Sequence, residues 1–181
     1  MQPTLIEKAI RMATSAHQGQ MRKDGPAYII HPVAVSLMLA QHGFAEAVVA
    51  AALVHDVLED TPITADEMGE ELGSEVLELV QTVSYDKTLS WEDQRIKYVE
   101  AVRAGSDGAK AISIADKIHN AESLLMGYER EGKAMWAHFN RSRDKKIWFE
   151  EEMLKMARES WQHPLVEEYA ALVEKLKALE Y

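Results

Sequence analysis

The chain has 181 residues, no cysteine and a formal net charge of −10 at pH 7. This acidic balance disfavours nucleic acid and anionic membranes as partners, and the missing thiols exclude disulfides and thiolate metal sites. No apolar run approaches the ~20 residues that cross a bilayer and no secretory signal opens the chain, so we expect a soluble, cytoplasmic protein with one sizeable core.

Helical spacing of apolar residues predicts that the chain opens with two helices. Thr4 and Glu7 have the spacing of a capping box, and an apolar helical face follows them. Residues 17–30 contain glycine and proline turn signals, so we expect a loop there. Pro32 suits the first turn of the second helix, and Gly43 marks the end of that helix.

The central prediction is one helix over residues 45–60, AEAVVAAALVHDVLED. It starts as an unbroken apolar run, which is typical of a buried helix. It ends with His55, Asp56, Glu59 and Asp60, paired four residues apart so that they line one side. Charged helix ends are often solvated, and a single core histidine is usually just hydrogen-bonded. Four such groups without a neighbouring cation favour a site in which a metal ion offsets their charge.

Capping patterns predict the helices that follow. The capping residues are Thr64 with Glu67, Ser74, and Ser90 with Asp93. Further helices are expected at about 109–125, at 142–161 and after Pro164. Since β alternation, repeats and linkers are absent from the sequence, we expect an all-α fold. The expected organisation is a single domain over residues 1–181, with the helices from about 142 packing on the core.

Two residues outside the central helix have the chemistry to complete a metal site. His31 precedes a proline at a helix entry, and Asp116 lies inside the apolar helical stretch ISIADKIHNA, on the same face as Asn120. Taken alone, Asp116 also fits a buried, hydrogen-bonded carboxylate. Imidazole and carboxylate ligands suit Mn²⁺, Fe²⁺ or Zn²⁺, and a carboxylate-rich set favours the harder ions.

Three ordered motifs resemble a known family. They are RKDGPAYIIHP at 22–32, AALVHDVLEDT at 51–61 and ADKIHNA at 115–121. The pattern is similar to the HD-domain phosphohydrolase superfamily. It most resembles the hydrolase domain of RelA/SpoT enzymes and the stand-alone small alarmone hydrolases, over about residues 5–125.

The resemblance implies an all-α HD-domain fold and a metal-dependent enzyme. One divalent ion would be held by His31, His55, Asp56 and Asp116. Mn²⁺ is the expected ion, with Fe²⁺, Zn²⁺ and Mg²⁺ as alternatives. The resemblance assigns water activation and proton handling to Glu59 and Asp60. The residues themselves support this chemistry, because a metal-bound water is acidified and a nearby carboxylate can take its proton.

The resemblance also implies a substrate. Arg22, Lys23 and Asn120 match the family's nucleotide pocket, and the family reaction removes pyrophosphate from the 3′ position of guanosine bis(diphosphate), ppGpp. The expected partner is therefore a small phosphorylated nucleotide. Nucleic acid and membrane partners are not expected, and a homo-oligomer is an open alternative. No synthetase domain fits in the remaining length, so the expected alarmone activity is degradative.

Two positions depart from the alarmone-hydrolase pattern and leave alternatives open. Glu122 stands where close relatives usually carry arginine, and Trp91 stands where they tend to carry lysine. The basic stretch 141–146 either restores positive charge or is a solvated helix start. The alternatives are an HD phosphohydrolase for another nucleotide or phosphoester, and a non-catalytic nucleotide-binding regulator. Retention of Glu59 argues against the regulator, because a binding protein does not need that group.

Overall fold

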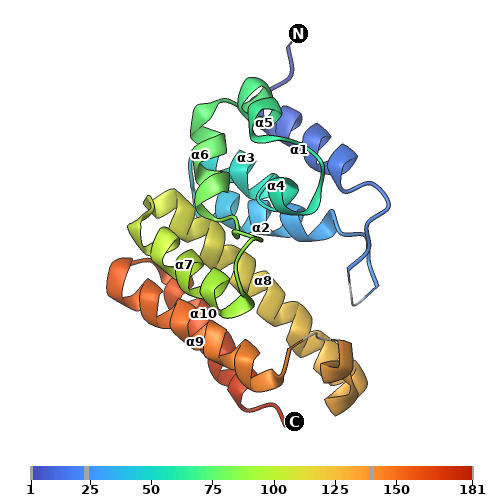
Figure 1. Ribbon diagram of the computed structural model, residues 1–181, viewed down its shortest axis with the longest axis vertical. Helices are drawn as coiled ribbons and strands as arrows, with labels where there is room; N and C mark the ends of the chain where they lie inside the picture. The colour runs from blue at the N-terminus through green and yellow to red at the C-terminus, as the bar shows by residue number, and fades with distance from the viewer. Residues whose placement is uncertain (1, 23–24, 139–140, 181) are drawn as a thin grey trace. The chain divides into compact units, whose positions relative to one another are not determined.

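The computed structural model describes residues 2–22, 25–138 and 141–180, and its regular structure is helical (Figure 1). The elements are α1 (Leu5–Ala16), α2 (Ile30–Gln41), α3 (Glu46–Leu53), α4 (Val57–Asp60), α5 (Ala65–Leu72), α6 (Ser74–Thr82), α7 (Trp91–Ala104), α8 (Asp107–Glu131), the 3₁₀ helix η1 (Gly132–His138), α9 (Arg143–Ser160) and α10 (Pro164–Lys177). In the described ranges the β pairing is one isolated bridge, Met21 with Ala27. The predicted all-α fold is confirmed.

The chain divides into two compact units, Met1–Ser113 and Ile114–Tyr181, and the boundary falls inside α8. We call them unit 1 and unit 2 and describe each by itself. That residues 1–181 form one domain, with the helices from about 142 packing on the core, remains a prediction.

Three of the four predicted capping residues are confirmed. Thr4 accepts a hydrogen bond from the Glu7 N–H at 3.2 Å, and Ser90 caps α7 in the same way. Thr64 and Glu67 form the complete reciprocal capping box before α5. The prediction for Ser74 is wrong: it is the first helical residue of α6. The glycine before it, with a φ of 91°, occupies the capping position instead.

The predicted single helix over 45–60 is also wrong, because it breaks between α3 and α4. The Nδ1 of His55 donates to the carbonyl of Ala52 at 2.7 Å. In a continuous α-helix that carbonyl would accept the N–H of Asp56, four residues on. The backbone instead makes tighter i→i−3 bonds, from Val54 N–H to the Ala51 carbonyl at 3.1 Å and from the N–H of residue 57 to the Val54 carbonyl at 3.0 Å.

Within unit 1, α3 packs against α1, α2 and α6 (Figure 1). The start of α8 belongs to this core. A Cβ added at Gly108 would lie 2.8 Å from Val48 Cγ2 and 3.2 Å from Leu79 Cδ2, so only glycine allows the helix this close. One turn later, the hydroxyls of Ser113 and Tyr98 hydrogen-bond at 2.8 Å. The first two turns of α8 are therefore held in unit 1.

In unit 2, α9 and α10 pack against each other around a buried carboxylate. Glu150 is 1% exposed. It accepts a hydrogen bond from the Tyr169 hydroxyl at 2.5 Å and pairs with Lys146 at 2.6 Å. The buried charge is thus compensated from both sides, as low-dielectric surroundings require.

We expect Tyr169→Phe to destabilise the protein by about 1–3 kcal/mol, because a buried carboxylate loses a donor that nothing replaces. Urea denaturation followed by circular dichroism measures the effect. A midpoint equal to that of the parent would show that this bond contributes nothing to the packing of α9 on α10.

Candidate functional site

His31 and His55 lie beside each other in unit 1. The first is at the start of α2, where its N–H donates to the Tyr28 carbonyl at 2.9 Å, and the second is in the turn between α3 and α4. Their side chains are buried, and the ring centroids are 5.2 Å apart. Two segments distant in sequence thus bring two imidazoles together.

A hydrogen bond from the His55 ring to a backbone carbonyl determines which ring nitrogen can bind a metal. The bond from Nδ1 to the Ala52 carbonyl requires the ring proton on Nδ1. Nε2 then carries the lone pair, and it lies 3.2 Å from Oδ2 of Asp56. Metal-binding histidines are typically oriented through their other ring nitrogen in this way.

Oδ2 of Asp56 is the atom on which the cluster converges. It lies 3.2 Å from Nε2 of His55 and 3.8 Å from Nε2 of His31, and it accepts a hydrogen bond from the Tyr28 hydroxyl. The Asp56 side chain keeps 20% of its surface exposed, so solutes can reach it. Two imidazole nitrogens and a carboxylate oxygen suit Mn²⁺, Fe²⁺ or Zn²⁺, so these three residues fit a divalent ion.

The two predicted catalytic carboxylates sit on α4 and have different surroundings. Glu59 Oε1 accepts the backbone N–H of Tyr85 at 2.9 Å, which fixes the carboxylate group. Asp60 is exposed and pairs with Lys87 at 3.0 Å, and the same ammonium donates to the Glu59 carbonyl at 2.5 Å. The end of α4 is therefore tied to the segment that follows α6.

The predicted substrate residue Arg22 lies on the loop between α1 and α2. Its N–H donates to the Pro26 carbonyl at 2.9 Å, and the bridge between Met21 and Ala27 closes the same loop. The Arg22 side chain is half-buried. Lys23, predicted beside it, lies outside the described residues.

Unit 2 contains the remaining predicted residues on α8. Asp116 is buried; Oδ2 pairs with Lys117 at 2.7 Å, and Oδ1 accepts from Asn120 Nδ2 at 2.5 Å. The predicted shared face of Asp116 and Asn120 is confirmed. The sequence interpretation missed Lys117, which is buried and has its ammonium 5.4 Å from the centroid of the Phe149 ring. Its signal was a lysine directly beside an acid within an apolar helix.

Trp91, one of the two departures, belongs to a stack of aromatic rings and one guanidinium in unit 1. Arg95 lies 5.4 Å from the centroid of the Trp91 ring and 3.8 Å from that of Tyr85, and Tyr85 stacks on Tyr98 at 4.4 Å. Trp91, which stands where relatives tend to carry lysine, therefore contacts the cation of Arg95. The sequence interpretation missed Arg95, although its i+4 spacing from Trp91 on a helix was a usable signal.

The basic stretch 141–146 forms structural bonds in unit 2. Arg143 donates to the Lys177 carbonyl at 2.6 Å, and Lys146 pairs with Glu150. Arg143 thus connects the start of α9 to the end of α10, whereas Lys146 pairs within α9. Arg141 and Lys145 are exposed, as expected for a solvated helix start.

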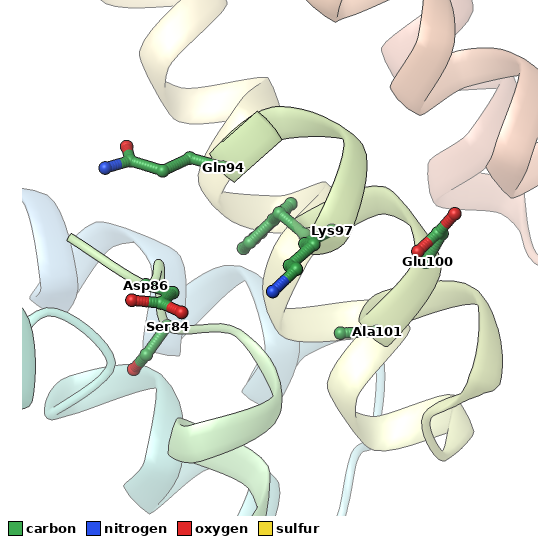
Figure 2. Close-up of a pocket in the computed structure, with 7 residues that line it drawn as sticks. Ser84, Asp86, Gln94, Lys97, Glu100 and Ala101 are labelled. Carbon is green, nitrogen blue, oxygen red and sulfur yellow. The ribbon is translucent and has the colours of Figure 1, made fainter. Parts of the chain in front are cut away.

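A separate pocket of about 490 Å³ opens on α7 in unit 1 (Figure 2). Its lining residues are Ser84, Asp86, Gln94, Lys97, Tyr98, Glu100 and Ala101. Figure 2 shows the Lys97 side chain reaching toward the segment that carries Ser84 and Asp86. None of the residues predicted for the site line this pocket.

The helical architecture, together with two buried histidines beside a partly exposed aspartate, defines the class of protein: an all-α protein with a site suited to a divalent metal. Comparison with known families agrees. The HD domain model matches residues 9–146 of the chain. The chain belongs to the HD domain family.

Relatives with assigned activities resemble it over about two thirds of its length. Mouse guanosine-3′,5′-bis(diphosphate) 3′-pyrophosphohydrolase MESH1 is 40% identical over 121 residues, which is 65% of this chain and 68% of MESH1. The Haemophilus influenzae enzyme of the same activity is 39% identical over 119 residues, which is 62% of this chain but 18% of that protein. The chain thus spans under a fifth of that relative.

A solved structure extends the similarity to the whole chain. It is that of a metazoan ortholog of SpoT, which hydrolyses ppGpp and plays a role in starvation responses. It matches with a TM-score of 0.81 over 99% of both chains at 25% identity. Among the described residues, no helix is both long enough and apolar enough to cross a membrane.

Glu122, the second departure, has a shifted pKa. Partial burial and, second, the charge of Glu168 raise the pKa of this carboxyl, while Lys175 opposes the shift. Because the unfolded chain ionises this group more easily, its ionisation destabilises the fold above the unfolded-state pKa and has no effect well below it.

We therefore expect Glu122→Gln to raise the melting temperature by about 1 °C at pH 7, a small effect because the side chain is largely exposed. The gain should disappear at about pH 3.5. Differential scanning calorimetry at both pH values checks this. An equal gain at both would mean that packing, not charge, is responsible.

Proposed function

We propose that this protein is a metal-dependent phosphohydrolase that hydrolyses ppGpp, or a close purine analogue, to the nucleoside diphosphate and pyrophosphate. The observation that carries the proposal is the convergence of His31 Nε2 and His55 Nε2 on Asp56 Oδ2. Support comes from the relatives, because MESH1 and the Haemophilus influenzae protein are named as 3′-pyrophosphohydrolases of this nucleotide.

Asp116 is our proposed fourth ligand. Support comes from residue type and burial, because Asp116 is a buried carboxylate and carboxylate oxygens suit Mn²⁺. We propose Mn²⁺ as the native ion, because two carboxylates beside two imidazoles favour the harder ions.

A bound divalent ion would acidify a coordinated water and polarise a phosphoryl oxygen. We assign the proton transfer to Glu59, whose Oε1 is held by the Tyr85 N–H, so that Oε2 is the atom that takes the proton. Asp60 is the second candidate for proton handling, and it also holds Lys87 against the end of α4.

Arg22, Lys23 and Asn120 are our proposed substrate contacts. Arg22 is on a loop closed by backbone hydrogen bonds, which lowers the entropy cost of holding a phosphate. Asn120 is oriented by its bond to Asp116. Trp91 and Glu122 each remove a positive charge, and this favours the alternative of a less phosphorylated nucleotide as substrate.

The test is an assay of the purified chain with Mn²⁺ against ppGpp, pppGpp, GTP and GDP. Pyrophosphate and orthophosphate are quantified separately. We expect pyrophosphate from ppGpp and none from GDP. Orthophosphate from a simpler nucleotide would replace the substrate assignment with the alternative. Tight nucleotide binding without turnover would identify a non-catalytic regulator.

Glu59→Gln should slow turnover by about 10²–10⁴-fold, because the substitution keeps the shape but removes the base. Metal binding should be unchanged in this variant, as measured by calorimetric titration with Mn²⁺. Glu70→Gln, the same chemical change at an exposed position of α5, is the matched control and should retain parental rates.

Asp116→Ala removes a proposed metal ligand, so Mn²⁺ affinity and turnover should fall together in this variant. If Glu59→Gln turns over at the parental rate with metal bound, the proton acceptor must be another group, and Asp60 is the next to substitute.

A further inference from the structure

Four aromatic rings follow one another from the end of α1 to the cluster of His31, His55 and Asp56. The centroid of His17 is 4.7 Å from that of Tyr28, which is 6.0 Å from that of His31, which is in turn 5.2 Å from that of His55. The two rings nearest the cluster are proposed ligands. The other two, His17 and Tyr28, have no role in the proposed chemistry.

Tyr28 touches the cluster through its hydroxyl. The hydroxyl donates to Oδ2 of Asp56, the oxygen that also faces Nε2 of both histidines. A tyrosine O–H at this atom selects one orientation of the carboxylate and keeps Oδ2 directed toward the imidazoles. Hydrogen bonds of this kind to a ligating group commonly tune metal affinity.

His17 and Gln20 hold Tyr28 in place. His17 is 3% exposed and packs its ring on Tyr28, and its Nδ1 lies 2.9 Å from Gln20 Oε1. The Gln20 amide can face only one way, because its Nε2 donates to the Asp60 carbonyl at 3.2 Å. Its oxygen therefore accepts from His17, which places the histidine proton on Nδ1.

Two further observations show that this arrangement is more than packing. The Gln20 backbone carbonyl accepts the Tyr28 N–H at 2.9 Å, so Gln20 and Tyr28 also close the loop that carries Arg22. Nε2 of His17 is buried without a hydrogen-bond partner among the described residues, a cost that a phenyl ring would avoid. The imidazole is thus needed for its Nδ1, which orients Gln20.

We propose that Tyr28 is a positioning residue that orients Asp56 Oδ2 toward the metal, and that His17 and Gln20 act through it. The proposal rests on the proposed function, because Asp56 must be a metal ligand. It extends that function by connecting the Arg22 loop to the metal ligands through Tyr28, and to the end of α4 through the Gln20–Asp60 bond.

The test is Mn²⁺ binding to the full chain without substrate, measured by isothermal titration calorimetry. We expect Tyr28→Phe to weaken Mn²⁺ binding by about 10–100-fold, because the ring remains but the donor to Asp56 is lost. Tyr169→Phe is the matched control, since it also removes a tyrosine hydroxyl from a carboxylate. This control should lower thermal stability and leave Mn²⁺ affinity within twofold.

A double-mutant cycle tests whether His17 acts through Tyr28. His17→Ala should weaken Mn²⁺ binding in the parent but have no further effect in the Tyr28→Phe background, where no hydroxyl remains to be positioned. Melting temperatures of the metal-free variants show that each is folded. Equal losses in both backgrounds would overturn the role of His17.

Parental Mn²⁺ affinity in Tyr28→Phe would overturn the positioning role while leaving the proposed function intact. Absence of Mn²⁺ binding by the parent would overturn both. The expected binding pattern in a protein that leaves ppGpp intact would support the positioning role, and only the substrate assignment would fail.

Discussion

The hydrogen bond from His55 Nδ1 to the Ala52 carbonyl is the interaction on which the site depends. It uses the Ala52 carbonyl, which in a continuous helix would accept the N–H of Asp56. The apolar helix accordingly ends at Leu53, and a short new helix begins at Val57. The same bond places the imidazole lone pair on Nε2, facing Asp56. One bond therefore shapes the backbone and prepares a metal-binding nitrogen.

Charge compensation is the second theme of the structure. The chain has 20 lysine and arginine residues against 30 aspartate and glutamate residues, and several of these cations pair with carboxylates near the predicted site. Lys87 pairs with Asp60 at the end of α4, and Lys117 pairs with the buried Asp116. In unit 2, Lys146 neutralises the buried Glu150. Buried carboxylates are tolerated because each has a cation or a hydroxyl donor beside it.

Much of the fold was predictable because its signals are local. The pairs Thr4 with Glu7 and Thr64 with Glu67 satisfy helix N–H groups within one turn, so their spacing alone marks a helix start. Ser74 shows the limit of this reasoning. A serine before an apolar run has the right chemistry for a cap, but the positive φ of Gly73 moved the helix boundary by one residue.

The sequence by itself determined the helical class, the family motifs and the candidate residues His31, His55, Asp56 and Asp116, because periodicity, caps and motif spacing are properties of neighbouring positions. Only the tertiary structure decided that Tyr28 donates to Asp56, that Tyr85 holds Glu59 and that the Arg95 guanidinium lies over the Tyr85 ring. The first two of these contacts join residues 28 and 26 positions apart in sequence, and the third depends on the path of a loop. A side chain's partner is set by how helices pack, and no local pattern encodes that packing.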